Sequence, residues 1–192
     1  MSEADFITQL QQGDSAAYKE LVQQFGDKVF NTTIGILQNE EDAEDTTQEV
    51  FIEVFKSVHG FKGESKLSTW IYRIAVIKAY EYLRRKKRKK RFAQVQSLFG
   101  MESVLPQTDK QHFYHPGAQL ENKERAAILF GAIDKLPDNQ KTAFILHKTE
   151  GLSYIEVAEV MKTSVSSVES LMFRAKQNLQ KLLADYYNKN EK

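Results

Sequence analysis

A run of polar side chains near the C-terminus has the composition of a surface that recognises DNA bases. Hydroxyls and carboxylates can hydrogen-bond to base edges in the major groove, and arginine can reach a guanine or a phosphate. The side chains concerned are Ser166, Ser167, Glu169, Ser170, Phe173 and Arg174. They can act together only if a helix presents them on one side.

The stretch around them has the apolar spacing of two short helices joined by a tight turn. Three residues fall on one face of each helix: Val157, Ala158 and Met161, then Val165, Val168 and Leu171. This pattern predicts a helix-turn-helix, whose second helix lies in the major groove. The turn has Lys162 where glycine is usual, so a left-handed backbone there would be strained. The alternative is an ordinary helical hairpin in which these residues only form a core.

Basic and aromatic side chains interleave in a second stretch. Phe61–Lys66 is expected to be a polar loop, in which Gly63 can adopt a positive φ. The long helix expected after it ends in eight consecutive bases, Arg84–Arg91. Cations that follow phosphates, together with aromatic rings that stack on bases, hold single-stranded nucleic acid in many proteins. The alternative is that the aromatics, Trp70 and Tyr72, belong to the core.

A third stretch is strongly acidic, with seven Asp or Glu residues between Glu40 and Glu53. A helix is expected here, with Asn39 as its N-cap. Its predicted core face comprises Ala43, Thr47, Val50, Phe51, Val54, Phe55 and Val58. An acidic outer face can simply be solvated, yet the acids exceed what capping and the helix dipole need, so a basic protein partner is a second interpretation. A carboxylate-bridged metal site would require a Glu-x-x-His pattern, which the sequence lacks.

The composition is that of an ordinary globular protein built from helices. Hydrophobic residues make up 41% and charged residues 28% of the 192 residues, with only three prolines. The chain has no cysteine, which excludes disulfides and thiolate metal sites, and its four histidines lack ligand spacing. We therefore expect no metal and no cofactor. We see neither a signal-peptide pattern nor an apolar run of membrane-spanning length, so we expect a soluble, cytoplasmic protein.

Helical periodicity divides the chain into two small domains. Residues 1–92 are expected to form the first, and residues 122–192 the second, a four-helix module that contains the helix-turn-helix. Between them, residues 93–121 lose periodicity and contain two prolines, which predicts a flexible linker. The predicted fold class is therefore all-α, with two helical domains.

Three motifs of the first domain, in this order, resemble region 2 of bacterial sigma factors. They are Asp42–Phe51 (DAEDTTQEVF), Phe61–Ser65 (FKGES) and Thr69–Ala75 (TWIYRIA), and the basic run follows them. Leu136–Leu179 resembles region 4 of the same factors. With only these two regions, the chain is similar to the extracytoplasmic-function subgroup of the sigma-70 superfamily. The resemblance implies a non-catalytic promoter-specificity subunit of bacterial RNA polymerase, monomeric when free.

The resemblance also implies roles for individual residues. Docking on the clamp helices of the largest subunit of core polymerase is assigned to Asp42, Asp45, Gln48 and Glu49. Recognition of the minus-ten DNA element, with a base flipped into the loop, is assigned to Lys62, Gly63, Glu64, Ser65, Lys66, Trp70, Arg73, Arg84 and Arg85. Recognition of the minus-thirty-five element is assigned to Ser164, Ser166, Ser167, Glu169, Ser170, Phe173, Arg174 and Lys176. Besides core polymerase and promoter DNA, an anti-sigma protein is an expected partner. In the free protein, the acidic helix is a second candidate for covering the basic DNA-binding surfaces.

Two positions depart from the pattern of the family. Ile77 stands where many relatives have Asn, which removes one polar contact to the melted strand. Glu169 stands where many have a base, and a carboxylate favours the amino group of cytosine. A stand-alone dimeric helix-turn-helix regulator is the alternative function, and it would need a ligand or phosphoacceptor domain and palindromic sites. A nucleic-acid enzyme ranks third, because the only dense carboxylates lie on a single expected helix.

Overall fold

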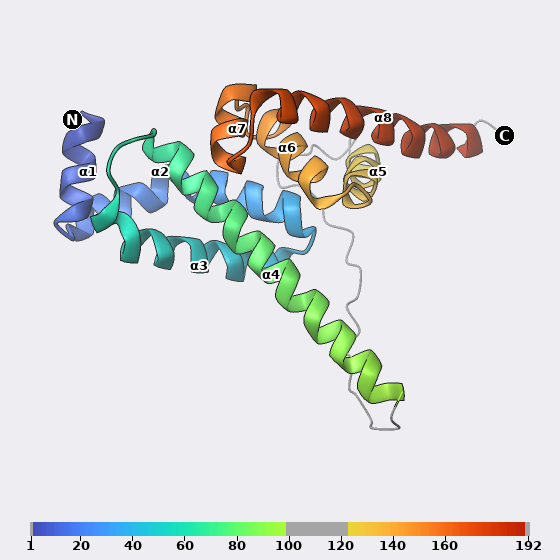
Figure 1. Cartoon of the computed structure of the whole chain (residues 1–192), viewed down its shortest axis with the longest axis horizontal. Coiled ribbons are helices and arrows are strands. Elements are labelled where there is room, and N and C mark those ends of the chain that lie inside the picture. Colours follow the sequence, from blue (N-terminus) through green and yellow to red (C-terminus); the bar gives the residue numbers. More distant parts are fainter. Residues whose placement is uncertain (1, 99–122, 191–192) are drawn as a thin grey trace.

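The computed structural model describes residues 2–98 and 123–190, and all regular structure in these ranges is helical (Figure 1). The N-terminal module consists of α1 (Glu3–Gln11), α2 (Ser15–Leu37), α3 (Glu40–Ser57), the 3-10 turn η1 (Val58–Gly60) and α4 (Leu67–Leu98). The C-terminal module consists of α5 (Lys123–Asp134), α6 (Asp138–Lys148), α7 (Tyr154–Met161) and α8 (Val165–Asn190). The predicted all-α, two-domain fold is confirmed.

The helix that precedes the predicted linker is longer than the sequence indicated. α4 continues to Leu98, into the segment predicted as linker, and residues 99–121 of that segment lie outside the described residues. In the described ranges, no helix combines the length and the apolarity needed to cross a membrane.

Local capping groups fix where several helices begin. The Asp14 carboxylate accepts hydrogen bonds from Ala16 N and Ala17 N at the start of α2. The Asn39 side chain accepts one from Asp42 N at 2.8 Å, as the sequence predicted. A capping box, which the sequence analysis missed, joins Ser153 to Glu156 at the start of α7. α7 ends at Met161, and its C-cap Lys162 has φ 51°. The left-handed backbone, whose strain at a lysine counted against the helix-turn-helix, is therefore present.

The core of the N-terminal module lies where α2, α3 and α4 pack, with α1 closing one end (Figure 1). Fully buried aliphatic side chains from the three long helices meet there: Leu21, Val29, Val50, Val54 and Ile71. One residue predicted for this core is not in it. Phe55 is 49% exposed, because the buried positions of α3 recur at Thr46, Val50 and Val54 and leave it at the edge of the stripe.

The C-terminal module is built around the helix-turn-helix formed by α7 and α8. Val157, Ala158 and Val168 are buried at the crossing of the two helices, as the spacing predicted, whereas Val165 is 39% exposed. A second cluster, which includes Ile133, Leu136, Ile145 and Leu179, packs α5 and α6 against α8.

Candidate nucleic-acid and protein interfaces

The predicted DNA-binding loop lies between η1 and α4. Lys62, Gly63, Glu64 and Lys66 are exposed, and Gly63 has the positive φ (71°) that the sequence predicted. Trp70, on the first turn of α4, is partly buried and its ring lies 4.9 Å from the ring of Phe61. It therefore lies at the boundary between the core and the loop.

Side chains of helix α1 contact both ends of this loop. Gln11 Nε2 donates to the carbonyl of Phe61 at 2.9 Å and to that of Val58 at 3.3 Å. The Glu3 carboxylate accepts from the N–H of Leu67 at 3.1 Å, where α4 begins. No local signal reveals these contacts, since they join residues separated by 47 to 64 positions in the chain. The loop is thus fixed by side chains from a helix outside its own motif.

Two cations predicted to bind DNA contact the C-terminal module. Lys66 Nζ lies 2.9 Å from the carboxylate of Glu156, and Arg73 Nη2 donates to the carbonyl of Glu159 at 2.7 Å. Hydrogen bonds from Ser153 and from Lys66 lower the pKa of Glu156 to about 2, and the same carboxylate raises the pKa of Lys66. Both acceptors belong to α7, so α7 engages two of the cations that the sequence assigned to DNA binding. Tyr72 is 4% exposed, and its alternative assignment to the core is the correct one.

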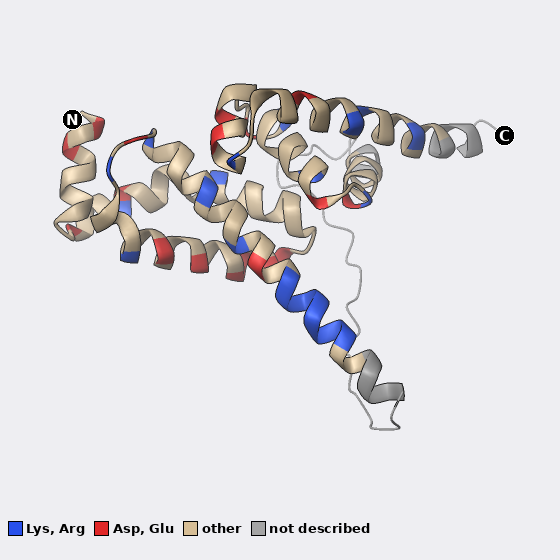
Figure 2. Ribbon diagram, in the orientation of Figure 1, with Lys and Arg blue, Asp and Glu red and all other residues tan. Residues whose placement is uncertain are grey.

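The basic run lies in the second half of α4, towards the end that extends away from the other helices (Figure 2). A run of like charges weakens a helix unless opposite charges lie beside it, and α3 supplies them. Arg85 pairs with Glu49 at 3.1 Å, and Lys86 pairs with Asp42 at 2.7 Å. Arg84 is exposed. The acidic helix therefore pairs with bases of its own module.

These pairs divide the four residues predicted to dock on polymerase into two kinds. Asp42 and Glu49 are partly buried and engaged by α4, and Asp42 also accepts a hydrogen bond from the hydroxyl of Tyr82. Burial and this bond raise the pKa of Tyr82. Asp45 and Gln48 remain exposed.

The exposed side of α3 continues beyond the acids as an apolar surface. Ile52 is 53% exposed and Phe55 is 49% exposed. With Asp45 and Gln48, they recur at intervals of three and four residues and therefore form one stripe along α3. We call these four residues the α3 stripe. The periodicity of the sequence predicted Phe55 in the core and gave no role to Ile52. Their exposure became apparent only once the buried stripe was known.

The predicted minus-thirty-five set lies on the outer side of α8. Its members Ser164, Ser166, Glu169, Ser170, Phe173, Arg174 and Lys176 are exposed, and Ser167 is partly buried. The Ser164 hydroxyl caps the helix by accepting from Ser167 N at 3.1 Å, so its first role is structural. Phe173, 63% exposed, presents an apolar ring that suits a thymine methyl group. The chain thus carries three exposed surfaces, on the loop and α4, on α3 and on α8.

Comparison with protein-family models matches both modules. Residues 21–89 match Sigma-70 region 2, and residues 126–179 match Sigma-70, region 4. The ECF RNA polymerase sigma-E factor of Haemophilus influenzae is 33% identical over 184 residues, which covers 94% of each chain. The RNA polymerase sigma-H factor of Pseudomonas aeruginosa is 30% identical over 186 residues, covering 92% of this chain and 91% of that one.

Two solved structures share the fold. CnrH, in complex with the cytosolic domain of CnrY, matches with a TM-score of 0.67 at 22% identity and covers 94% of this chain and 96% of its own. The sigma factor RpoE of Bartonella quintana, in complex with the anti-sigma factor NepR, gives the same TM-score and identity over 87% of this chain and 96% of its own.

Proposed function

Because this chain belongs to the extracytoplasmic-function sigma factors of the sigma-70 family, and is thus a promoter-specificity subunit of RNA polymerase, we propose how its surfaces divide that task. The α3 stripe docks on core polymerase, the loop and α4 hold the minus-ten element, and α8 recognises the minus-thirty-five element. We assign the protein no catalytic step and place it in the cytoplasm, where its polymerase acts.

The observation that carries the docking assignment is the composition of the α3 stripe. Asp45 and Gln48 offer acceptors to a basic partner, and Ile52 and Phe55 offer apolar area beside them. A protein interface needs a buried apolar centre flanked by polar contacts, and acidic groups alone would give little affinity. The predicted docking residues Asp42 and Glu49 act in this proposal through α4, by fixing the position of α3 against the basic run.

The docking assignment is tested by co-elution of the protein with bacterial core polymerase on a sizing column. The variant Asp45→Ala/Gln48→Ala/Ile52→Ala, all members of the α3 stripe, should lose co-elution, and Phe55→Ala should weaken it. A matched control replaces three exposed polar residues of α2, Glu20→Ala/Gln23→Ala/Gln24→Ala, and should leave co-elution unchanged. Equal co-elution of both triple variants would contradict the assignment.

The DNA assignments follow from charge and exposure. On the N-terminal module, Lys62, Lys66, Arg73, Arg84 and Arg85 can neutralise phosphates around the loop, and Trp70 provides an aromatic face. On α8, Glu169 and Arg174 contact base edges and phosphate, and Phe173 packs on a methyl group. Glu169→Lys in holoenzyme should change which minus-thirty-five sequence is preferred in a selection from random duplexes, whereas Lys176→Ala should weaken binding to all sequences alike.

We further propose that an anti-sigma protein binds this chain. The proposal rests on the family, and one of the structures with the same fold is described as a complex of a sigma factor with its anti-sigma factor. Such a partner would have to compete with core polymerase and DNA for the surfaces described above. This proposal is tested by isolating the chain from its host at low salt and identifying the proteins that core polymerase displaces from it.

A further inference from the structure

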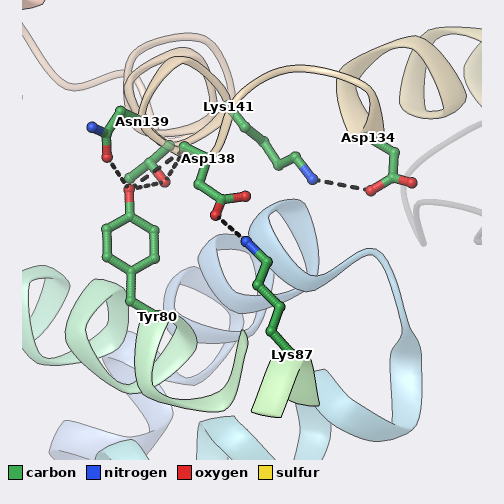
Figure 3. Close-up of polar contacts among 7 residues, drawn as sticks. Tyr80, Lys87, Asp134, Asp138, Asn139 and Lys141 are labelled. Carbon is green, nitrogen blue, oxygen red and sulfur yellow. Dashed lines mark hydrogen bonds and ion pairs between the residues drawn. The ribbon is translucent and has the colours of Figure 1, made fainter. Parts of the chain in front are cut away.

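The basic run of α4 consists of two parts with different surroundings. After Arg84, the bases Arg85–Lys87 are each paired with an acid of the same chain. The acids are Glu49, Asp42 and Asp138, at 3.1, 2.7 and 2.9 Å respectively, and Figure 3 shows the last of these pairs. Two of the acids belong to α3 and one to α6. The charge of this first part is therefore largely compensated within the protein.

The four bases that follow, Arg88–Arg91, have no such compensation, and we call them the distal bases. All four are exposed, and no acid of the described ranges forms an ion pair with any of them. They lie where α4 extends away from the other helices (Figure 2). Like charges three and four residues apart weaken a helix. The distal bases thus oppose the stability of the helix that carries them, and we infer that they serve an external partner.

The arrangement of the distal bases around the helix axis indicates the shape of that partner. Successive residues of an α-helix are about 100° apart, so four in a row surround most of the axis. A groove of duplex nucleic acid accepts an α-helix and has phosphates along both walls. A lipid surface meets one side of a helix and requires an apolar stripe there, yet Phe92 is the only apolar residue from 84 to 92. Duplex nucleic acid is therefore the better match.

The length of α4 indicates which part of the duplex the distal bases reach. α4 begins at Leu67, directly after the loop. With a rise of about 1.5 Å per residue, Arg88–Arg91 lie about 32–36 Å along the helix from Leu67. One turn of duplex DNA has nearly the same length, about 34–36 Å. Along the chain, α4 leads towards the module that we assign to the minus-thirty-five element, so the duplex at this distance lies between the two elements.

We propose that the distal bases bind the phosphates of the duplex between the two promoter elements, in a groove and without reading its sequence. The inference rests on the proposed binding of the minus-ten element by the loop. It adds a third DNA contact to the two surfaces that read bases. Phosphate contacts of this kind fix the position of a protein on the duplex and release counterions, so their signature is a strong dependence of affinity on salt.

The first test measures the affinity of holoenzyme for a fluorescent promoter duplex over a series of salt concentrations. Glutamine removes the charge and keeps a good helix former, so the test variant is Arg88→Gln/Lys89→Gln/Lys90→Gln/Arg91→Gln. Each phosphate contact contributes about 0.9 to the slope of log affinity against log salt, so the slope should fall by at least about 2. The loss should be the same when the sequence between the elements is randomised.

The matched control removes four exposed bases that lie elsewhere in the chain. It is Lys19→Gln/Lys135→Gln/Lys148→Gln/Lys181→Gln. It changes the net charge by the same amount and should leave the slope nearly unchanged. Equal slopes for the two variants would overturn the inference. If the test variant binds promoter like the wild type but loses binding to vesicles of anionic lipid, the distal bases serve a membrane and the inference is wrong.

The second test locates the contact on the DNA. Because the chain has no cysteine, a photocrosslinker can be attached at Lys89→Cys and, as a reference in the loop, at Lys62→Cys. In holoenzyme on promoter duplex, the crosslinker at residue 89 should react between the two elements, about 10 base pairs from the crosslinks of residue 62. Crosslinks of residue 89 inside the minus-ten element, or to polymerase alone, would overturn the inference.

A shorter fragment separates the inference from the function on which it rests. On DNA that contains the minus-ten element but ends at its edge, the variant of the distal bases should bind like the wild type. Lys62→Ala/Lys66→Ala should bind this fragment more weakly. If the distal variant is impaired here too, its bases act at the element itself, and the inference fails while the minus-ten role stands. If the loop variant binds normally, the minus-ten role fails and the inference fails with it.

Discussion

Replacement of Gln11 by alanine tests whether α1 positions the DNA-binding loop. The side chain makes one short hydrogen bond to the carbonyl of Phe61 and a longer one to that of Val58. A hydrogen bond of this kind contributes about 0.5–1.5 kcal/mol, and a carbonyl left unpaired adds to the loss. We expect the free energy of unfolding to fall by about 1–2 kcal/mol. For a chain of this size, that lowers Tm by roughly 2–8 °C.

The functional effect of Gln11→Ala should exceed what this loss of stability explains. The Phe61 carbonyl is the point at which the loop leaves η1, so its release lets Lys62–Lys66 sample other conformations. If ordering the released loop on DNA binding costs about 1 kcal/mol of binding free energy, holoenzyme should bind a promoter fragment roughly fivefold more weakly. The measurement is the equilibrium affinity of holoenzyme for a fluorescent promoter fragment, at a temperature well below the Tm of the variant.

The matched control is Gln12→Ala, a neighbouring glutamine whose side chain is exposed. It should change neither the Tm nor the affinity for DNA. If Gln11→Ala lowers the Tm as expected but holoenzyme binds promoter with wild-type affinity, α1 stabilises the fold without positioning the loop. The proposal that α1 positions the loop for DNA binding would then be refuted. If the Tm is unchanged too, the hydrogen bonds themselves contribute nothing measurable.

Three further predictions concern the C-terminal module. Lys162→Gly should raise the free energy of unfolding by about 0.5–1 kcal/mol in urea titrations, since glycine relieves the left-handed strain, and a loss of stability would contradict this. The pKa of Glu156 lies below its ordinary value of 4.5, so its contribution to stability is present above that pH and is lost as the pH falls towards 2. The difference in stability between wild type and Glu156→Gln should therefore shrink over this range, and a constant difference would argue against it. Asp134→Asn should cost about 1–3 kcal/mol in the same titrations, because it removes the negative charge that lies 3.0 Å from the ammonium of Lys141, a residue only 5% exposed, whereas Lys141→Met should be nearly neutral (Figure 3).

Much of the local structure was predictable because its causes lie within a few residues of one another. The cap at Asn39 and the positive φ of Gly63 each follow from a residue type and its immediate neighbours. Motif order was also sufficient to identify the family, since sequence comparison needs no contact between the motifs.

The candidate surfaces were predicted as sets of residues, but not as surfaces with partners. The sequence assigned Lys66 and Arg73 to DNA binding without a partner in the chain, and the structure pairs them with α7. It placed Phe55 in the core, although the true buried stripe of α3 is rotated away from that residue. Periodicity indicates that a helix has an apolar face, but the exact edge of that face depends on which helices pack against it.

Most of the helices, the cap at Asn39, the order of the two regions and the types of residue available for DNA and polymerase can be inferred from the order of the amino acids alone. The contacts of Gln11 with the loop, of Gly35 with Ile145 and of Glu156 with Lys66 appear only in the folded molecule. The difference lies in the range of the interactions. Capping and periodicity act over a few residues of one chain segment, whereas these contacts join segments that come together only when whole helices pack. Their geometry follows from the shapes of all the packed side chains at once.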